Sequence, residues 1–306
     1  LVVCLQSVLQ CPQICKMLNY LEREIMNELI NYFNSNQSNL IHKWIHYFDI
    51  YDFYFNKFIN KNINFVEIGI FDGGSLKMWK KYFGPKANII GIDINPLTKT
   101  LEDDQIKIII GDQEDEKFLD TIVSKIPKID ILLDDGGHLN TQQINTFKKL
   151  FPIISENGVY VCEDIHTSYK KNYNRGFLLK RKYHPINPIR LLKILEEKYY
   201  TLKNKLMINS SRLYTNEYLS FIEFSKQLID LINAWYYKND FELNAKSDEN
   251  IYTKTISSIH YYPSMLVVEK KSVDKPSTIT SGKVTILKDE LNKNIINALH
   301  SERKKI

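Results

Sequence analysis

Five short and nearly continuous apolar runs set the hydrophobic pattern in the middle of the chain. They are NFVEIG at 64–69, NIIGID at 88–93, IKIIIGD at 106–112, IDILLDD at 129–135 and GVYVCED at 158–164. The runs start roughly twenty to thirty residues apart, so that each gap is long enough to hold a helix. Buried strands that alternate with helices are typical of a doubly wound parallel sheet. We therefore predict an α/β fold of this class.

The N-terminal part of the chain has a helical period instead. Apolar residues recur there every three to four residues, at Leu18, Leu21, Ile25, Leu29 and Phe33. An aromatic-rich stretch, HKWIHYFDIYDFYFNKF, follows at 42–58. We predict an N-terminal helical segment over 1–60, with two helices packed on the sheet. The aromatic rings are interpreted as core or subunit packing, with a sugar-binding platform as the alternative.

Two alternatives stay open for residues 1–16, because the chain begins with Leu rather than Met. These residues are either disordered or not part of the native protein. Three of the four cysteines lie in this segment and the fourth, Cys162, lies in a predicted strand, so the cysteines do not form a disulfide framework. This usage favours a reducing compartment, and we expect a cytoplasmic protein.

Residue types that start and stop helices lie between the predicted strands. Ser75 is the predicted N-cap of a helix that ends at Gly84, which Pro85 follows. A second helix over 113–126 has acidic residues in its first turn and Pro127 after its last.

The alternation of strands and helices ends after the fifth run. Residues 170–216 form a basic insert, with twelve Lys or Arg and two Glu between 170 and 212. A helix is predicted over 220–237, and a final pair of strands over 255–271 completes a mostly parallel sheet with an antiparallel strand. The predicted catalytic domain covers 61–271, and residues 272–306 form a peripheral C-terminal tail.

The composition is that of a globular protein, with 43% hydrophobic and 25% charged residues. A net charge of only +5 gives no reason to expect nucleic-acid binding. No apolar run approaches the length that a bilayer requires, and we predict no transmembrane segment.

Polar residues follow the first three predicted strands at the sheet edge where ligands bind in this fold class. The first strand leads into a loop that contains Glu67, Gly69, Gly73 and Ser75. The glycines let the backbone turn and approach a ligand closely. The spacing differs from the G-x-G-x-x-G that binds a pyrophosphate, and a carboxylate beside the loop suits a cationic ligand better. S-adenosylmethionine carries an ammonium and a sulfonium and has no phosphate.

The second and third strands supply the rest of the predicted donor site. The second strand ends in Asp93, whose carboxylate can accept both hydroxyl hydrogens of an adenosine ribose. The third ends in Asp112 and Gln113, which suit an adenine amino group. Together with the loop, these positions predict S-adenosylmethionine as the cofactor.

Two neighbouring predicted strands both end in acidic pairs. Asp134 and Asp135 follow the fourth run, and Glu163 and Asp164 follow the fifth. Carboxylates this close would repel one another unless a cation neutralised them. Oxygen ligands indicate a hard divalent ion, Mg²⁺ first, with Mn²⁺ or Ca²⁺ as alternatives. Asp134 is expected to cap its loop with its side chain near the cofactor rather than to bind the metal.

His138 follows Asp135 by three residues and is the predicted general base. A cation lowers the pKa of a sugar hydroxyl, and an imidazole can then accept its proton near neutral pH. The alternative is a histidine that only stabilises the turn. His166 and Tyr169 follow the same strand end and are candidate substrate contacts, with loop orientation as the alternative.

Six motifs within roughly 40–170 point to a known family. These motifs are HKWIHYFDIYDFYF, VEIGIFDGGSLKMW, GIDINP, GDQEDEKFL, DDGGHLNTQQINTF and GVYVCEDIHTSY, and the likeness resumes at FIEFSKQLIDLINAW and IHYYPSMLVVEK. In these motifs the chain resembles the metal-dependent sugar O-methyltransferases of the mycinamicin and macrocin type, whose bacterial relatives are often labelled cephalosporin hydroxylase. The resemblance implies a class I methyltransferase fold and S-adenosylmethionine as donor. It further implies a magnesium site at Asp135, Glu163 and Asp164, with His138 as base. The basic insert departs from the family pattern, so the substrate is not carried over.

The leading hypothesis is a methyltransferase that acts on a sugar hydroxyl of a bacterial surface glycan precursor or a glycosylated natural product. Its expected partners are a sugar, nucleotide-sugar or glycan acceptor and, from the family likeness, further copies of the chain. The basic insert is a solvated face or subunit contact, or else it attracts an anionic acceptor or an anionic membrane surface. One rival is an oxidoreductase or oxygenase on the same fold, and another is a non-catalytic methyltransferase-like binding subunit.

Overall fold

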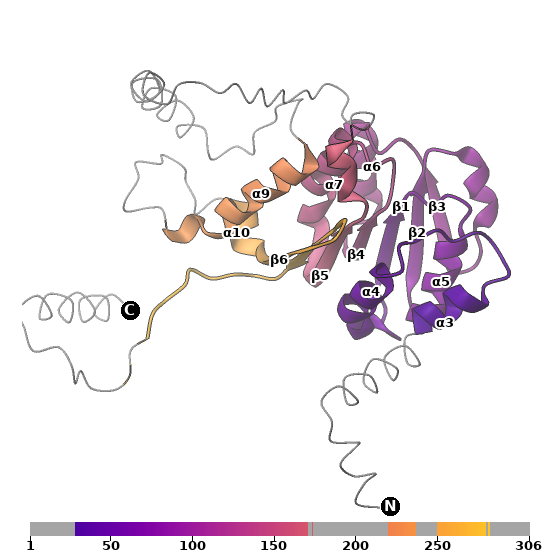
Figure 1. Cartoon of the computed structure of the whole chain (residues 1–306), viewed down its shortest axis with the longest axis horizontal. Coiled ribbons are helices and arrows are strands. Elements are labelled where there is room, and N and C mark those ends of the chain that lie inside the picture. The colour runs from indigo at the N-terminus through magenta and orange to yellow at the C-terminus, as the bar shows by residue number, and fades with distance from the viewer. Residues whose placement is uncertain (1–27, 171–172, 174–219, 237–249, 280, 282–306) are drawn as a thin grey trace, which may run out of the picture. The chain divides into compact units, whose positions relative to one another are not determined.

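The computed structural model describes residues 28–170, 173, 220–236, 250–279 and 281, and its architecture is shown in Figure 1. All seven predicted strands are present. They are β1 (Asn64–Ile68), β2 (Asn88–Asp93), β3 (Ile106–Ile110), β4 (Ile129–Asp134), β5 (Ile154–Cys162), β6 (Ile256–Tyr262) and β7 (Met265–Lys270).

The seven strands form one sheet in the order β3-β2-β1-β4-β5-β7-β6. Strands β1 to β5 are parallel to one another, whereas β7 runs antiparallel to both β5 and β6. The strand order reverses between β1 and β4, which places the carboxyl ends of β1, β4 and β5 side by side. This topology confirms the predicted doubly wound sheet with a final antiparallel strand.

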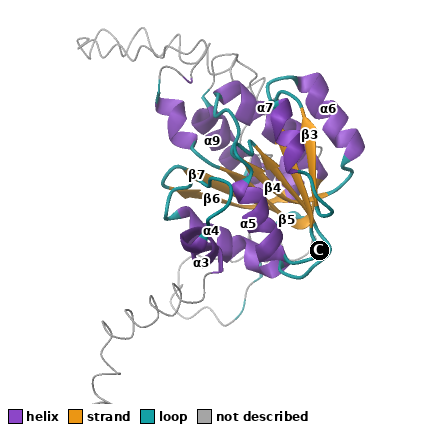
Figure 2. Cartoon of the chain, turned by 90° about the vertical axis from the view of Figure 1, so that its right-hand side faces the viewer, coloured by secondary structure: helices purple, strands orange, loops and turns teal. Residues whose placement is uncertain are grey.

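Helices cover both faces of this sheet, as Figure 2 shows. The α-helices are α3 (Glu28–Ser35), α4 (Tyr47–Phe55), α5 (Gly74–Phe83), α6 (Glu116–Lys125), α7 (Asn140–Leu150), α9 (Phe221–Ile232) and α10 (Ile251–Thr255). The 3₁₀ helices are η1 (Asn56–Phe58), η2 (Pro96–Leu101), η3 (Phe151–Ile153), η4 (Ile165–Tyr169) and η6 (Ala234–Tyr236). Helices α3, α4 and α5 pack on one face, and α6, α7 and α9 pack on the other.

The alternation of side chains along the strands divides the core into these two layers. In β1, Phe65 faces α4 and α5, whereas its neighbour Val66 faces the opposite layer with α6 and α7. Every residue of β4 is buried, as expected for a strand covered on both faces. The aromatic stretch that forms α4 buries Tyr47, Phe48 and Tyr51 among other rings. It therefore packs in the core, and burial of each such ring stabilises the fold by roughly 1.5–3 kcal/mol.

One local prediction was wrong. Helix α5 begins at Gly74, and its N-cap is Gly73 rather than Ser75. Gly73 has a φ of 78°, and a Cβ built there would lie 2.4 Å from a methyl carbon of Leu101. Ser75 does not cap the helix because its hydroxyl donates to the Glu67 carboxylate at 2.9 Å. The gap between β2 and β3 holds the 3₁₀ helix η2.

Several predictions fall on residues outside the described ranges. They include the helical pattern before residue 28, nearly all of the basic insert and most of the C-terminal tail. The described residues up to Asp274 form one compact unit, and those from Lys275 onward belong to a second. Among the described helices, none has the length and apolar character that crossing a bilayer requires.

Candidate active site

A cavity of about 460 Å³ lies at the carboxyl ends of the parallel strands. Most of the predicted site residues line it: Gly69, Ser75, Asp93, Asp112, Gln113, Asp135, His138, Glu163 and Asp164. Glu67, Gly73 and Asp134 are not among its lining residues. The sheet therefore brings together side chains that lie up to about a hundred residues apart in the sequence.

Gly69 allows the end of β1 to pass close to the end of β4. Its φ is 82°, and a Cβ built on it would lie 2.1 Å from the Asp135 carbonyl oxygen. No other residue type fits that position without displacing the backbone that carries Asp135. The glycine loop thus sets the distance between the predicted donor site and the acidic cluster.

The predicted adenosine contacts are held by the backbone around them. Asp93 accepts hydrogen bonds from the backbone N–H groups of Ile70 at 3.0 Å and Asn95 at 2.8 Å. Asp112 accepts one from the Glu114 N–H at 2.8 Å. These bonds fix both carboxylates at the cavity wall, where their assignment to ribose and adenine stays a prediction.

Asp134 points into the core, because neighbouring residues at a strand end alternate between faces. Its carboxylate accepts hydrogen bonds from the Gln113 amide at 2.6 Å and the Tyr160 hydroxyl at 3.1 Å. Burial raises the pKa of Asp134 to about 7. Its contacts link the ends of β3, β4 and β5, and the structure does not place its side chain against the cavity.

Lys43 lies between three carboxylates and was not singled out from the sequence. Its Nζ lies 2.5 Å from Asp135 Oδ2, 2.8 Å from Glu163 Oε1 and 3.6 Å from Glu67 Oε1, and its side chain is 3% exposed. Burial lowers the pKa of Lys43, but the charges of Asp135, Glu163 and Glu67 outweigh this and hold the pKa well above its usual value. The available signal was a lysine at the start of the aromatic-rich stretch.

The two buried glutamates of this group have different hydrogen-bond partners. Glu163 accepts from Lys43 and from the Tyr51 hydroxyl. Burial, followed by the charge of Asp135, raises the pKa of Glu163 well above its usual value. Burial also raises the pKa of Glu67 to about 7, although Lys43 and Ser75 oppose the shift. The raised pKa values favour the protonated form of both acids, and Lys43 is the cation that opposes this shift.

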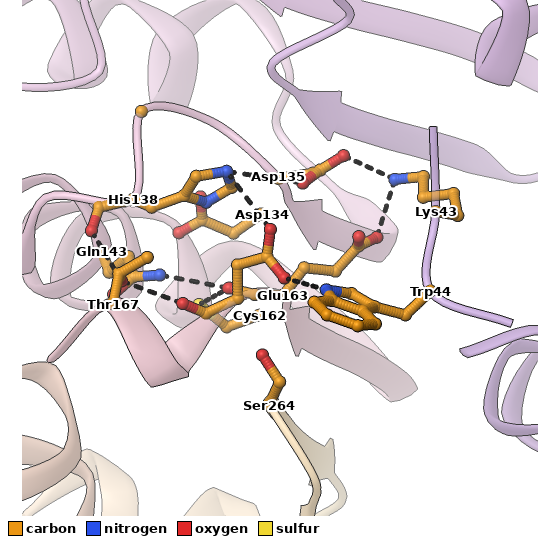
Figure 3. Close-up of polar contacts among 12 residues, drawn as sticks. Lys43, Trp44, Asp134, Asp135, His138, Gln143, Cys162, Glu163, Thr167 and Ser264 are labelled. Atoms are coloured by element: carbon orange, nitrogen blue, oxygen red, sulfur yellow. Dashed lines mark hydrogen bonds and ion pairs between the residues drawn. The ribbon is translucent and has the colours of Figure 1, made fainter. Parts of the chain in front are cut away.

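Asp135, His138 and Asp164 converge at the wall of the cavity. Figure 3 shows Asp135 and His138 with their neighbours. His138 Nε2 lies 3.9 Å from Asp135 Oδ1 and 3.6 Å from Asp164 Oδ2. One ligand atom from each residue lies within 4.8 Å of the others, and their side chains are 20–24% exposed. His138 Nδ1 is buried and has no hydrogen-bond partner among the described residues.

Protein donors occupy the outer oxygen of each aspartate and leave the inner one facing His138. Asp135 Oδ2 accepts from Lys43, whereas Asp164 Oδ1 accepts from the Trp44 indole at 3.1 Å and the Tyr47 hydroxyl at 2.9 Å. The inner oxygens, Asp135 Oδ1 and Asp164 Oδ2, point to the same space. Two converging carboxylate oxygens and a nearby imidazole fit a divalent cation.

The backbone at this cluster adopts conformations that non-glycine residues rarely take. His138 has a φ of 57° and Asp164 a φ of 52°. Left-handed residues of this kind often occur where function requires a side-chain direction. Of the predicted ligands, Asp135 and Asp164 thus lie together with His138, whereas Glu163 turns toward Lys43 and Tyr51. His166 and Tyr169 line a separate cavity nearby.

No protein-family model matches the chain, but known proteins resemble it. The mycinamicin VI 2''-O-methyltransferase of Micromonospora griseorubida is 39% identical over 127 residues, which cover 39% of this chain and 31% of that protein. The 8-demethyl-8-alpha-L-rhamnosyl tetracenomycin-C 2'-O-methyltransferase of Streptomyces olivaceus is 27% identical over 239 residues, which cover 75% of this chain and 52% of that protein. The chain therefore spans about a third to a half of the length of these relatives.

Solved structures give the same result. The MycE methyltransferase of the mycinamycin pathway, in complex with Mg and SAH, superposes with a TM-score of 0.59 at 25% identity over 89% of this chain and 58% of that one. The fold is thus that of a class I methyltransferase, and the resemblance to mycinamicin- and macrocin-type sugar O-methyltransferases is confirmed.

Proposed function

We propose that the chain is an O-methyltransferase that uses S-adenosylmethionine and a divalent cation, Mg²⁺ or Mn²⁺, to methylate a sugar hydroxyl. The observation that carries this proposal is the convergence of Asp135, Asp164 and His138 beside the glycine-lined cavity. The complexes of MycE with Mg and SAH support it.

The cavity has the features that the methyl donor requires. Its volume of about 460 Å³ is within the usual range for small-molecule sites. Gly69 lets the ends of β1 and β4 lie close together at the cavity, and Asp93 and Asp112 present carboxylates at its wall. The donor's ammonium and sulfonium are positive, which favours a site whose acids exceed its cations.

The acidic cluster and His138 would act on the acceptor. Asp135 and Asp164 would hold the cation through their inner oxygens, and Glu163 lies next to Asp135 across Lys43. When bound, the cation supplies charge that lowers the pKa of the acceptor hydroxyl. His138 Nε2 would accept that proton while the hydroxyl oxygen attacks the sulfonium methyl carbon and the methyl–sulfur bond breaks. The sheet would align oxygen, methyl and sulfur.

The acceptor class is taken from the relatives. Those described above are named for acting on glycosylated natural products, and one MycE structure contains mycinamycin VI. We infer a sugar on a glycosylated natural product as the acceptor, with a bacterial surface glycan precursor as the alternative. The cytoplasmic location, the homo-oligomer and contact of the basic insert with an anionic surface stay predictions.

An oxygenase is disfavoured by the residues themselves. A non-haem iron site of that kind uses two histidines and one carboxylate. The cluster here supplies one histidine and two carboxylates.

The test is transfer of tritiated methyl from S-adenosylmethionine to a panel of glycosides, with Mg²⁺ and with excess chelator. We expect label in a glycoside only when the metal is present, and restoration when Mg²⁺ or Mn²⁺ is added back. Donor binding without transfer to any glycoside, nucleotide sugar or glycan fragment would indicate a non-catalytic binding subunit. Transfer that persists in chelator would remove the metal from the proposal.

A further inference from the structure

A second cavity, of about 350 Å³, lies beside the candidate active site. Its walls come from η4, from α9 and from the end of β6. The residues that matter here are His166, Tyr169, Ile222, Lys226, Tyr261 and Tyr262. None of them lines the larger cavity. The volume is sufficient for one or two rings of a small molecule.

The two cavities meet at the segment that begins with Asp164. His166 Nδ1 lies 2.5 Å from the Ser264 hydroxyl and 3.8 Å from Asp164 Oδ1. Trp44, which binds the same carboxylate oxygen, packs edge-on against His166 with ring centroids 6.2 Å apart. Figure 3 shows Trp44 and Ser264 apart from His138. A molecule held at the acidic cluster could therefore extend past Trp44 and His166 into the second cavity.

The aromatic walls of the second cavity are held in place by hydrogen bonds. The Tyr261 hydroxyl donates to Ser225 at 3.1 Å, and the Tyr262 hydroxyl lies 2.9 Å from that of Tyr54. Tyr169 is 77% exposed and Tyr261 42% exposed, so their rings are open to a ligand. Fixed aromatic rings offer contact area at little cost in conformational entropy, and they suit ligands with an apolar ring face.

The charge at this cavity favours an uncharged ligand. Among the described residues that line it, Lys226 is the single lysine or arginine, and its Nζ lies 2.6 Å from Glu223 Oε1. A phosphate or carboxylate entering here would have to compete with that glutamate. The cavity is thus poorly suited to the diphosphate of a nucleotide sugar.

We propose that this cavity binds the part of the acceptor next to the methylated sugar, an uncharged ring with an apolar face such as the aglycone of a glycoside. This inference rests on the proposed function and narrows its acceptor to a neutral glycoside. The rings of Tyr261 and Tyr169 provide the contact, while the acidic cluster holds the hydroxyl that reacts.

The test compares two ligands that differ only in the aglycone, p-nitrophenyl α-L-rhamnopyranoside and methyl α-L-rhamnopyranoside. Their affinities for the full chain are measured by saturation-transfer NMR in the presence of Mg²⁺ and S-adenosylhomocysteine. We expect the aryl glycoside to bind about tenfold more tightly than the methyl glycoside. Tyr261→Ala should remove this preference, whereas Tyr261→Phe, which keeps the ring, should retain it.

Two further variants make the test specific. Phe53→Ala removes a ring that is 70% exposed and lies outside both cavities, and it should leave the preference unchanged. Tyr169→Ala replaces the most exposed ring of the cavity and should reduce the preference even if Tyr261→Ala fails to fold. Equal affinities for the two glycosides in the wild type, or a preference that survives both alanine variants, would overturn the proposal. A preserved preference with no methyl transfer would overturn the proposed function and leave the cavity assignment intact.

Discussion

The two ends of strand β4 carry acids in opposite situations. Near its start, Asp130 accepts hydrogen bonds from the Asn64 N–H at 2.9 Å and the Ser155 hydroxyl at 2.5 Å, and it is 8% exposed. Just past its end, Asp135 lies 2.5 Å from the Lys43 ammonium and 3.9 Å from the His138 imidazole. The Asp130 carboxylate has two neutral hydrogen-bond donors and one exposed lysine, Lys128, whose Nζ lies 3.4 Å away, whereas the Asp135 carboxylate belongs to a cluster of like charges.

This difference separates a structural acid from a candidate functional one. Hydrogen bonds from neutral donors satisfy Asp130 locally and tie β1, β4 and β5 together at that end of the sheet. At the other end, burial and mutual repulsion raise the pKa of Glu163, and burial raises that of Glu67. Bringing acidic side chains together in this way contributes little to the stability of a fold. We therefore infer that the acidic cluster serves to bind a cationic ligand.

The largest effect is expected at the functional end. Asp135→Asn removes a ligand charge and should lower methyl transfer by at least about 10³-fold, since loss of metal assistance costs several kcal/mol of barrier. Steady-state rates at saturating Mg²⁺ measure the effect. A rate within tenfold of wild type would show that Asp135 does not hold the metal.

His138→Ala should lower the rate by about 10²–10⁴-fold, the usual contribution of a positioned general base. Binding of S-adenosylmethionine, measured by calorimetry, should change little. His260→Ala is the matched control, because His260 lies outside both cavities. If both histidine variants keep full activity, His138 has no role as base.

Lys43→Met should weaken metal binding and methyl transfer by roughly 10–100-fold, the usual cost of losing a partner that orients a metal ligand. Without the ammonium, Asp135 and Glu163 would lose the group that fixes their orientation. Lys57→Met is the control. Lys57 is also a lysine paired with a glutamate, with its Nζ 3.5 Å from Glu269 Oε1, but its side chain is 39% exposed and lies away from the acidic cluster. Stronger metal binding in Lys43→Met would instead make Lys43 a competitor of the cation.

The pH dependence of stability tests the burial of Glu67 in metal-free protein. The pKa of Glu67 is 4.5 in the unfolded chain and about 7 when folded. Between these two pH values the folded state therefore holds a proton that the unfolded state has lost. The contribution to the unfolding free energy is therefore present below pH 4.5 and falls as pH rises to about 7, by up to roughly 3 kcal/mol. Glu67→Gln should flatten the curve over this range, as measured by urea unfolding. Parallel curves for the two proteins would contradict the assigned burial.

The smallest effect on activity is expected at the structural end. Asp130→Asn should leave the rate within about twofold while lowering the unfolding free energy by about 1–2 kcal/mol, because two hydrogen bonds to a charged group are weakened. Thermal melts and rates on the same preparation measure both quantities. A large loss of activity with unchanged stability would erase the contrast between the two ends.

The sheet and the acidic cluster followed from the sequence because local pattern determines both. Near-continuous apolar runs mark strands buried on both faces, and residues just after such runs must meet at one edge. The pattern alone was therefore sufficient to place Asp135, Asp164 and His138 together.

Lys43 and the role of Gly73 could not be obtained in this way. Lys43 reaches the cluster because the segment before α4 crosses the sheet edge, a long-range arrangement that no local pattern encodes. Gly73 caps α5 because Leu101 fills the space of a side chain there, and because Ser75 turns to Glu67. The contacts of Glu163 with Lys43 and Tyr51 were also not predicted, because they too depend on a long-range arrangement of the chain.

Binding of Mn²⁺, followed by electron paramagnetic resonance, tests the central claim most directly, because it does not depend on any acceptor. We predict one bound Mn²⁺ per chain in the wild type and in Asp130→Asn. In Asp135→Asn and Asp164→Asn we predict a loss of affinity greater than the roughly 10–100-fold that an outer partner contributes. Equal Mn²⁺ binding by all four proteins, or none by the wild type, would contradict the account.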